Sequence, residues 1–168
     1  MADERFPTMD GSTSTTSIEY YQKQLTGAIP SQFGLMTELT KFNLNTNQLG
    51  STIPSQLGNL VKVTSNFAMG SNSLTSTIPT ELGKLVSMVT SLNLITNKLT
   101  ATIPTELGRL SKMFNSFSLN SNSLTSSIPS ELGAFSRISL AFDIGTNLLS
   151  KAIPSELGGL VGMKTFLK

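Results

Sequence analysis

Four glutamates recur at one position of a repeated segment, and their spacing raises the question of acid–base chemistry. They stand two residues after successive prolines, at Glu81, Glu106, Glu131 and Glu156. Two carboxylates can serve as general acid and general base when their surroundings separate their pKa values, as in a desolvated cleft. Equivalent, solvated residues in successive copies of one segment have no such asymmetry. We therefore expect no catalytic residue in this column, and the protein is not expected to be an enzyme.

The composition excludes most other reactive groups. The chain has no histidine, cysteine or tryptophan, so a Ser-His-Asp triad, thiol chemistry, disulfides and a nitrogen or sulfur metal site are all ruled out. No glycine-rich phosphate loop is present. A net charge of +2, with 13% charged residues, gives too weak a field for nucleic acid. No apolar run is long enough to span a membrane. We expect no metal, cofactor, nucleic-acid partner or membrane insertion.

The chain consists largely of copies of one short segment. Ile-Pro pairs begin at Ile29, Ile53, Ile78, Ile103, Ile128 and Ile153, so the first two are 24 positions apart and all later neighbours are 25 positions apart. An Asn-x-Leu motif recurs with the same constant period, at Asn47, Asn72, Asn97, Asn122 and Asn147. Self-similarity at such a period predicts a solenoid, in which stacked copies share one continuous core.

Each copy runs Leu-x-Leu-x-x-Asn-x-Leu and then Ile-Pro-x-Glu-Leu-Gly-x-Leu, as it does from Leu92 onward. This pattern resembles the leucine-rich repeat, in the plant-type variety with Ile-Pro on its outer side, and algal extracellular repeats are also similar. The resemblance covers about residues 18–167. It implies an α/β solenoid of about six coils over residues 18–168, with a parallel sheet on the concave face and short 3-10 or helical turns on the convex face.

Two features lie outside the regular pattern. Residues 1–17 are polar and are expected to form a flexible lead. Most copies also have four steps between Met88 or its equivalent and the strand residue Leu92 or its equivalent, where the usual spacing is three, so we expect a bulge before each strand.

Period-2 alternation assigns the strand residues to two faces. The first and third residues of triplets such as Phe42-Asn43-Leu44 should point inward and form columns of Phe and of Leu, Met or Ile. The recurring asparagine at 47, 72, 97, 122 and 147 follows each strand where the chain turns inward. Its amide can satisfy turn backbone groups, so we interpret this asparagine ladder as structural.

The outward strand residues define the candidate binding face. In leucine-rich repeats these positions usually form the concave binding surface, and the resemblance implies a non-enzymatic recognition or scaffold module at the cell surface or outside the cell. The chain itself starts without an export signal. A protein, peptide or glycan ligand is expected on Tyr21, Lys41, Asn43, Asn45, Asn66, Ala68, Ser91, Asn93, Ile95, Ser116, Ser118, Asn120 and Asp143.

Rows of hydroxyl residues beside the Ile-Pro pairs suggest an alternative function. They resemble the surfaces of ice-binding proteins, and some plant antifreeze proteins belong to this repeat family. Plant-type repeats often carry Thr-Gly here, whereas this chain has Ser76, Ala101 or Ser126 at the glycine position. Threonine also favours short extended segments, so these rows could instead form a second small strand. The candidate rows are Thr75, Thr77, Thr80, Thr100, Thr102, Thr105, Thr125, Ser127 and Ser130.

Two further expectations concern charge and the C-terminal end. Lys84 and Arg109 lie three residues after Glu81 and Glu106, within reach of an ion pair on a turn. Leu167 takes the place of Phe142 one repeat later, and no polar capping segment follows it. An uncapped end favours a fragment of a longer array or end-to-end self-association into a structural array.

Overall fold

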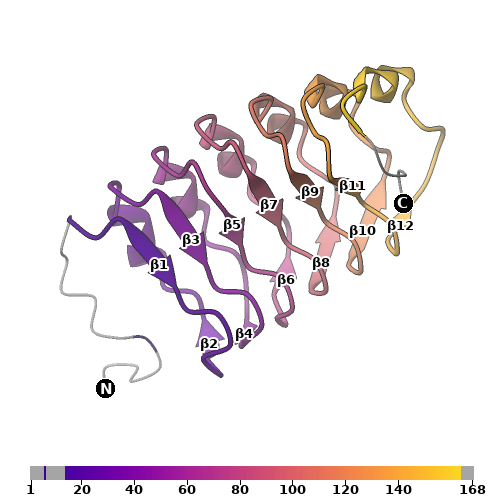
Figure 1. The fold of residues 1–168 in the computed structure, drawn as a ribbon. Coiled ribbons are helices and arrows are strands. Elements are labelled where there is room, and N and C mark those ends of the chain that lie inside the picture. Colours follow the sequence, from indigo (N-terminus) through magenta and orange to yellow (C-terminus); the bar gives the residue numbers. More distant parts are fainter. Residues whose placement is uncertain (1–5, 7–13, 164–168) are drawn as a thin grey trace.

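The computed structural model, which describes Phe6 and residues 14–163, places the repeated segments side by side as successive coils (Figure 1). Each coil contains a first strand, a second strand and a 3-10 turn. The first strands are β1 (Ser17–Glu19), β3 (Lys41–Asn43), β5 (Phe67–Ala68), β7 (Ser91–Asn93), β9 (Ser116–Ser118) and β11 (Ala141–Asp143). The second strands are β2 (Thr26–Ala28), β4 (Gln48–Gly50), β6 (Thr75–Ser76), β8 (Lys98–Ala101), β10 (Ser123–Ser126) and β12 (Leu148–Leu149). The turns are η1 (Ser31–Leu35), η2 (Ser55–Asn59), η3 (Thr80–Lys84), η4 (Thr105–Arg109), η5 (Ser130–Ala134) and η6 (Ser155–Gly159).

The first strands form a parallel sheet in the order β1-β3-β5-β7-β9-β11. Equivalent residues are Cα partners across this sheet, so one inward column runs Ile18, Phe42, Phe67, Leu92, Phe117 and Phe142. Phe42 stacks on Phe67 with ring centroids 5.4 Å apart, and Phe117 stacks on Phe142 at the same distance. The predicted solenoid with its Phe column is confirmed.

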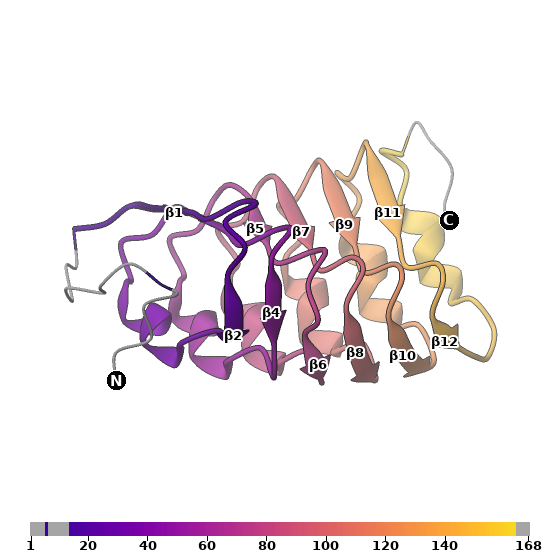
Figure 2. The ribbon, with the colours of Figure 1, turned by 90° about the horizontal axis from the view of Figure 1, so that it is seen from below.

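The turns lie on the opposite side of the core from this sheet (Figure 1), and the second strands form a lateral row between them (Figure 2). Each turn begins directly after proline, whose φ near −63° and missing N–H suit that position. The described residues contain 3-10 turns and no α-helix, so the helical part of the predicted α/β class is limited to these short turns. No helix among them is long and apolar enough to cross a membrane.

The expected bulge is visible as a two-to-one hydrogen-bond pattern before the strands. The carbonyl oxygen of Thr40, in the copy with three steps, accepts bonds from the N–H groups of both Thr64 and Ser65 (both 3.1 Å) in the next copy, which has four steps. The same sharing recurs between later coils. Two residues opposing one partner is the geometry that an inserted residue produces.

Two of the expectations concern the ends of the chain, namely the flexible lead at residues 1–17 and the C-terminal end at Leu167. Residues 1–5 and 7–13 of the expected lead lie outside the described residues, as does Leu167. Phe6 is buried, and its ring lies 5.4 Å from that of Phe33 in an edge-on arrangement. An aromatic side chain of the N-terminal segment therefore covers the core of the first coil.

A column of glycines sets how closely the turns stack. A Cβ added at Gly83 would lie 2.4 Å from the carbonyl oxygen of Glu106 in the next coil, and Gly34, Gly58, Gly108 and Gly133 have equivalent contacts. At Gly158, in the last described turn, no atom lies within 4 Å. The glycines are thus required by backbone contact between coils.

This column predicts opposite outcomes for one substitution at two equivalent positions. Gly83→Ala should lower the free energy of unfolding by about 1–3 kcal/mol, because the backbones of two coils must separate. Gly158→Ala should leave it unchanged or raise it by up to about 1 kcal/mol, because the site is open and the unfolded chain loses freedom. Urea denaturation followed by circular dichroism measures both, and equal losses would contradict the steric argument.

Candidate functional site

The asparagine ladder joins each coil to the coil before it. Asn97 Nδ2 donates to the carbonyl oxygen of Met69 in the preceding coil (3.1 Å) and to those of Leu94 and Ile95 in its own (both 3.2 Å). Its Oδ1 accepts the N–H of Leu74 in the preceding coil at 3.0 Å. Bonds of the same kind are made by Asn47, Asn72, Asn122 and Asn147. These side chains are committed to the backbone and are unavailable to a ligand.

Replacing one of these amides by a carboxylate tests the assignment. Asn122→Asp keeps the acceptor for Leu99 N–H but loses the donors to three carbonyl oxygens. We expect the free energy of unfolding to fall by about 1–3 kcal/mol or more, because buried acceptors lose their partners. Asn120→Asp is the control in the same coil, and chemical denaturation should show a change below about 0.5 kcal/mol.

The predicted binding residues come together on the concave side of the first sheet. Most are half-buried, Ala68 is buried, and Tyr21 and Asn66 are exposed. At the N-terminal edge Lys41 Nζ lies 3.0 Å from Glu19 Oε1. The hydrogen bond from Lys41 lowers the pKa of Glu19 below its usual value. Asp143 lies at the other end of the face, so the centre is polar and uncharged.

The amide acceptors of this face are already used inside the protein. Asn43 Oδ1 accepts the N–H of Asn45, and Asn93 Oδ1 accepts that of Ile95, each at 3.1 Å. Asn45 Oδ1 accepts the N–H of Gly70 at 2.6 Å. Among the described residues, the Nδ2 groups of these asparagines have no partner. The face therefore offers N–H donors to a ligand.

A shallow hollow of about 210 Å³ lies in the middle of this face, and we call it the concave hollow. Its lining is small and polar: Asn45, Asn66, Ala68, Ser91, Asn93, Ser116 and Ser118. Asn66 Oδ1 accepts the hydroxyl of Thr90 at 3.1 Å, so this amide too has its oxygen engaged. Three amide N–H₂ groups line a hollow that is suited to carbonyl oxygens.

The predicted hydroxyl rows lie on the lateral side, on or beside the second strands. Thr75, Thr77, Thr100 and Thr102 are exposed, as are Thr80 and Thr105 at the turn starts and Ser130 one coil further on; Thr125 and Ser127 are half-buried. The residue at the glycine position of each copy has positive φ: Gly27 (81°), Ser51 (64°), Ser76 (68°), Ala101 (62°), Ser126 (70°) and Lys151 (72°). The lateral segment is thus a second small strand with a left-handed residue at its end (Ser76, Ala101, Ser126), just beyond it (Ser51, Lys151) or within it (Gly27).

The lateral strands pair in a different register from the first sheet. Leu92 and Phe117 are partners 25 positions apart, whereas Thr75 pairs with Lys98, only 23 positions away. Equivalent lateral residues are therefore displaced by two positions, about 6.6 Å, along the strand direction. Threonines at equivalent positions are therefore not direct partners, whereas the shift makes Thr52 the bridge partner of Thr75.

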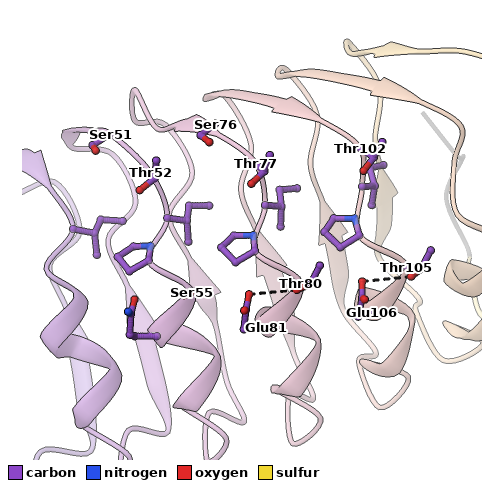
Figure 3. A pocket seen from close by; sticks show the side chains of 18 of the residues that line it. Ser51, Thr52, Ser55, Ser76, Thr77, Thr80, Glu81, Thr102, Thr105 and Glu106 are labelled. Carbon is purple, nitrogen blue, oxygen red and sulfur yellow. Dashed lines mark hydrogen bonds between the residues drawn. The ribbon is translucent and has the colours of Figure 1, made fainter.

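The structure also hollows the lateral side where the Ile-Pro pairs meet the turns. A groove of about 1050 Å³, the lateral groove, crosses five coils (Figure 3). Thr52, Thr77 and Thr102 lie on its strand side, and Glu81 and Glu106 lie at the turn starts (Figure 3). Sequence reasoning found the hydroxyl residues but missed the groove, because the residue pattern alone does not show how the lateral segments lie relative to the turns.

The expected ion pairs on the turns are not formed. Among the described residues, Glu81 lies beyond 4.0 Å of Lys84, and Glu106 beyond 4.0 Å of Arg109. The hydroxyls of Thr80 (3.3 Å) and Thr105 (3.4 Å) donate to these carboxylates instead. The threonine precedes the glutamate directly, so its hydroxyl reaches the carboxylate without ordering a long cationic side chain. No cluster of three metal-ligating side chains occurs in the described part of the chain.

The comparisons with known proteins agree on a single fold. The family model described as Leucine Rich Repeat matches residues 38–60. No curated protein gives a significant match to the sequence. The ectodomain of the plant membrane receptor kinase GASSHO1/SCHENGEN3 from Arabidopsis thaliana, in complex with CASPARIAN STRIP INTEGRITY FACTOR 2, is 35% identical over 93% of this chain, with a TM-score of 0.85.

Two other solved structures extend the comparison. The plant peptide hormone receptor RGFR1 in complex with RGF2 is 28% identical over 90% of this chain, with a TM-score of 0.70. A plant ice-binding protein is 20% identical over 97% of this chain and 68% of its own length, with a TM-score of 0.59, which shows the fold alone. The chain spans 18% of the first receptor structure and 28% of the second.

Proposed function

We propose, from the premise that this chain is a leucine-rich repeat solenoid, that it is a non-enzymatic recognition module whose concave face binds an extended peptide segment. The observation that carries the proposal is the concave hollow, where Asn45, Asn66 and Asn93 have their oxygens engaged internally and their N–H₂ groups uncommitted. Main-chain carbonyl oxygens are the acceptors that an extended peptide presents at regular intervals.

Shape and composition support a peptide ligand of low charge. The centre of the concave face has no charged side chain, and aromatic anchors of the kind found in tight protein interfaces are absent from the lining of the hollow. Affinity must then come from several directed hydrogen bonds. The receptor structures with 28% and 35% identity carry a peptide hormone or a named factor in complex, which supports ligands of this class.

The same comparison suggests the cellular location of this module. Two of the similar structures, with 35% and 25% identity, are ectodomains of receptor kinases from Arabidopsis thaliana, so we propose an extracellular or cell-surface location for this chain as well. A glycan ligand and self-association through the C-terminal coil stay predictions that no feature of the described residues favours.

Asn93→Asp tests the donor role without disturbing the fold. Asp143 occupies the equivalent position and accepts the N–H of Gly145 at 3.1 Å, as Asn93 accepts that of Ile95, so an aspartate preserves the internal bond. Only the Nδ2 donor is lost. For uncharged peptides selected from a random display library on the wild-type chain, we expect affinity in titration calorimetry to fall roughly threefold to tenfold.

A pair of tyrosine substitutions supplies the control for location. Ser118→Tyr fills the concave hollow and should abolish binding of the selected peptides, whereas Ser136→Tyr on the exposed convex side should leave it unchanged. Selected peptides that bind both variants equally would show that the concave face is not the binding site. A selection that yields no peptide, together with binding to a glycan array, would replace the peptide by a glycan.

Ice binding is the alternative function for the hydroxyl rows, and the structure bears on it in two ways. The exposure of Thr77 and Thr102 and the direct pairing of Thr52 with Thr75 are compatible with it, but equivalent threonines are displaced by two positions along the lateral strands, and Thr52, Thr77 and Thr102 line a groove. We expect no thermal hysteresis in nanolitre osmometry. Hysteresis that disappears in Thr77→Tyr plus Thr102→Tyr would establish ice binding instead.

A further inference from the structure

The lateral groove is a second concave surface, separate from the concave hollow and formed by other elements. It extends across five successive coils, from Ala28 and Ile29 to Pro129. Four steps of at least about 4.8 Å span roughly 20 Å, which accommodates about six residues of an extended chain. Its dimensions suit a linear ligand that lies along the axis of the solenoid.

The strand side of the groove is rich in uncommitted hydrogen-bonding groups. Thr77 and Thr102 make no hydrogen bond, through backbone or hydroxyl, to any residue that the structure describes. The lateral strands end at the left-handed residues Ser76 and Ala101, and beyond them the neighbouring coils no longer pair. Each of these coils therefore presents an unpaired peptide group and a hydroxyl. A second polypeptide can form hydrogen bonds with both groups.

The opposite side of the groove is negative. Glu81 and Glu106 are the charged residues in its lining, and Lys98 on the neighbouring strand β8 does not contribute to it. Ile78 and Ile103, each 2% exposed, form the floor with the prolines, and the lining contains no aromatic ring. A neutral sugar would find no stacking platform here, and a polyanion would be repelled.

We propose that the lateral groove binds an extended peptide segment carrying cationic side chains. Main-chain groups of the segment pair with the unpaired groups of Thr77 and Thr102, and lysine or arginine side chains reach Glu81 and Glu106. Electrostatic complementarity of this kind contributes mainly to selectivity and to the rate of association. The site differs from the concave hollow both in location and in the charge of its ligand.

Three blocked hexapeptides test the proposal on the full chain: alternating Ser-Lys, alternating Ser-Glu and alternating Ser-Gly. The amide signals of Thr77, Ile78, Thr102 and Ile103 should shift in ¹⁵N spectra with the Ser-Lys peptide and not with the Ser-Glu peptide. Shifts confined to the concave strands, or no shift at millimolar peptide, would overturn the proposal. A neutral oligosaccharide that shifts the same signals more strongly would assign the groove to glycans instead.

Two double variants with the same change in net charge distinguish binding of the Ser-Lys peptide in the lateral groove from non-specific electrostatic attraction to the whole protein. Glu81→Gln plus Glu106→Gln should weaken Ser-Lys binding roughly threefold to tenfold, because two exposed pairs are lost. Glu131→Gln plus Glu156→Gln changes the net charge equally, at carboxylates that accept a serine hydroxyl in the same way but lie outside the groove. Less than a twofold effect is expected there. Equal weakening by both double variants would show that only the overall charge matters.

Discussion

Hydrogen bonds from each coil to the coil before it are the interaction on which the rest of this structure depends. Asn97 shows the arrangement: one amide side chain closes the turn of its own coil and holds the backbone of the preceding coil at Met69 and Leu74. A single coil cannot bury its apolar side or satisfy these backbone groups alone. Every extensive contact between the secondary-structure elements joins adjoining coils, so stability depends on contacts between neighbours.

The same stacking of coils determines which hydrogen-bonding groups each face of the molecule exposes. First strands in register present their outward residues on one face. There the oxygens of Asn43, Asn45 and Asn93 accept backbone N–H groups, and the nitrogens have no partner among the described residues. On the lateral side the strands are sheared, and the coils separate after the left-handed residues. A face of aligned donors and a groove of unpaired peptide groups thus arise from one repeated segment.

Much of the fold could be predicted because the repeat determines it directly. A constant period with inward Phe42, Phe67 and Phe117 is sufficient for the first sheet, since equivalent residues there are direct partners or lie one coil further along the same column. The location of the outward residues on that face follows from alternation. The asparagine bonds follow from the position of the amide after the strand.

The sequence could not show how the lateral strands and the side chains of neighbouring coils are arranged relative to one another. Thr75 pairs with Lys98, 23 positions away, although the sequence repeats every 25 residues, so the repeat alone does not predict the register of the lateral strands. The expected pair of Glu81 with Lys84 did not form, because the neighbouring hydroxyl of Thr80 donates to the carboxylate. Which amide atoms stay free on the concave face depends on bonds to the next coil, as at Gly70, that only coordinates reveal.

The left-handed residues at or just beyond the ends of the lateral strands carry a conformational cost that accumulates with the number of coils. Ser51, Ser76, Ala101, Ser126 and Lys151 all adopt a conformation that glycine would enter freely. At about 1–2 kcal/mol each, five such residues oppose folding by roughly 5–10 kcal/mol, which is as large as the net stability of many whole domains. The packing between coils has to offset this cost. Three of these residues, Ser51, Ser76 and Ser126, also line the lateral groove, so part of this conformational cost lies at the rim of a binding surface.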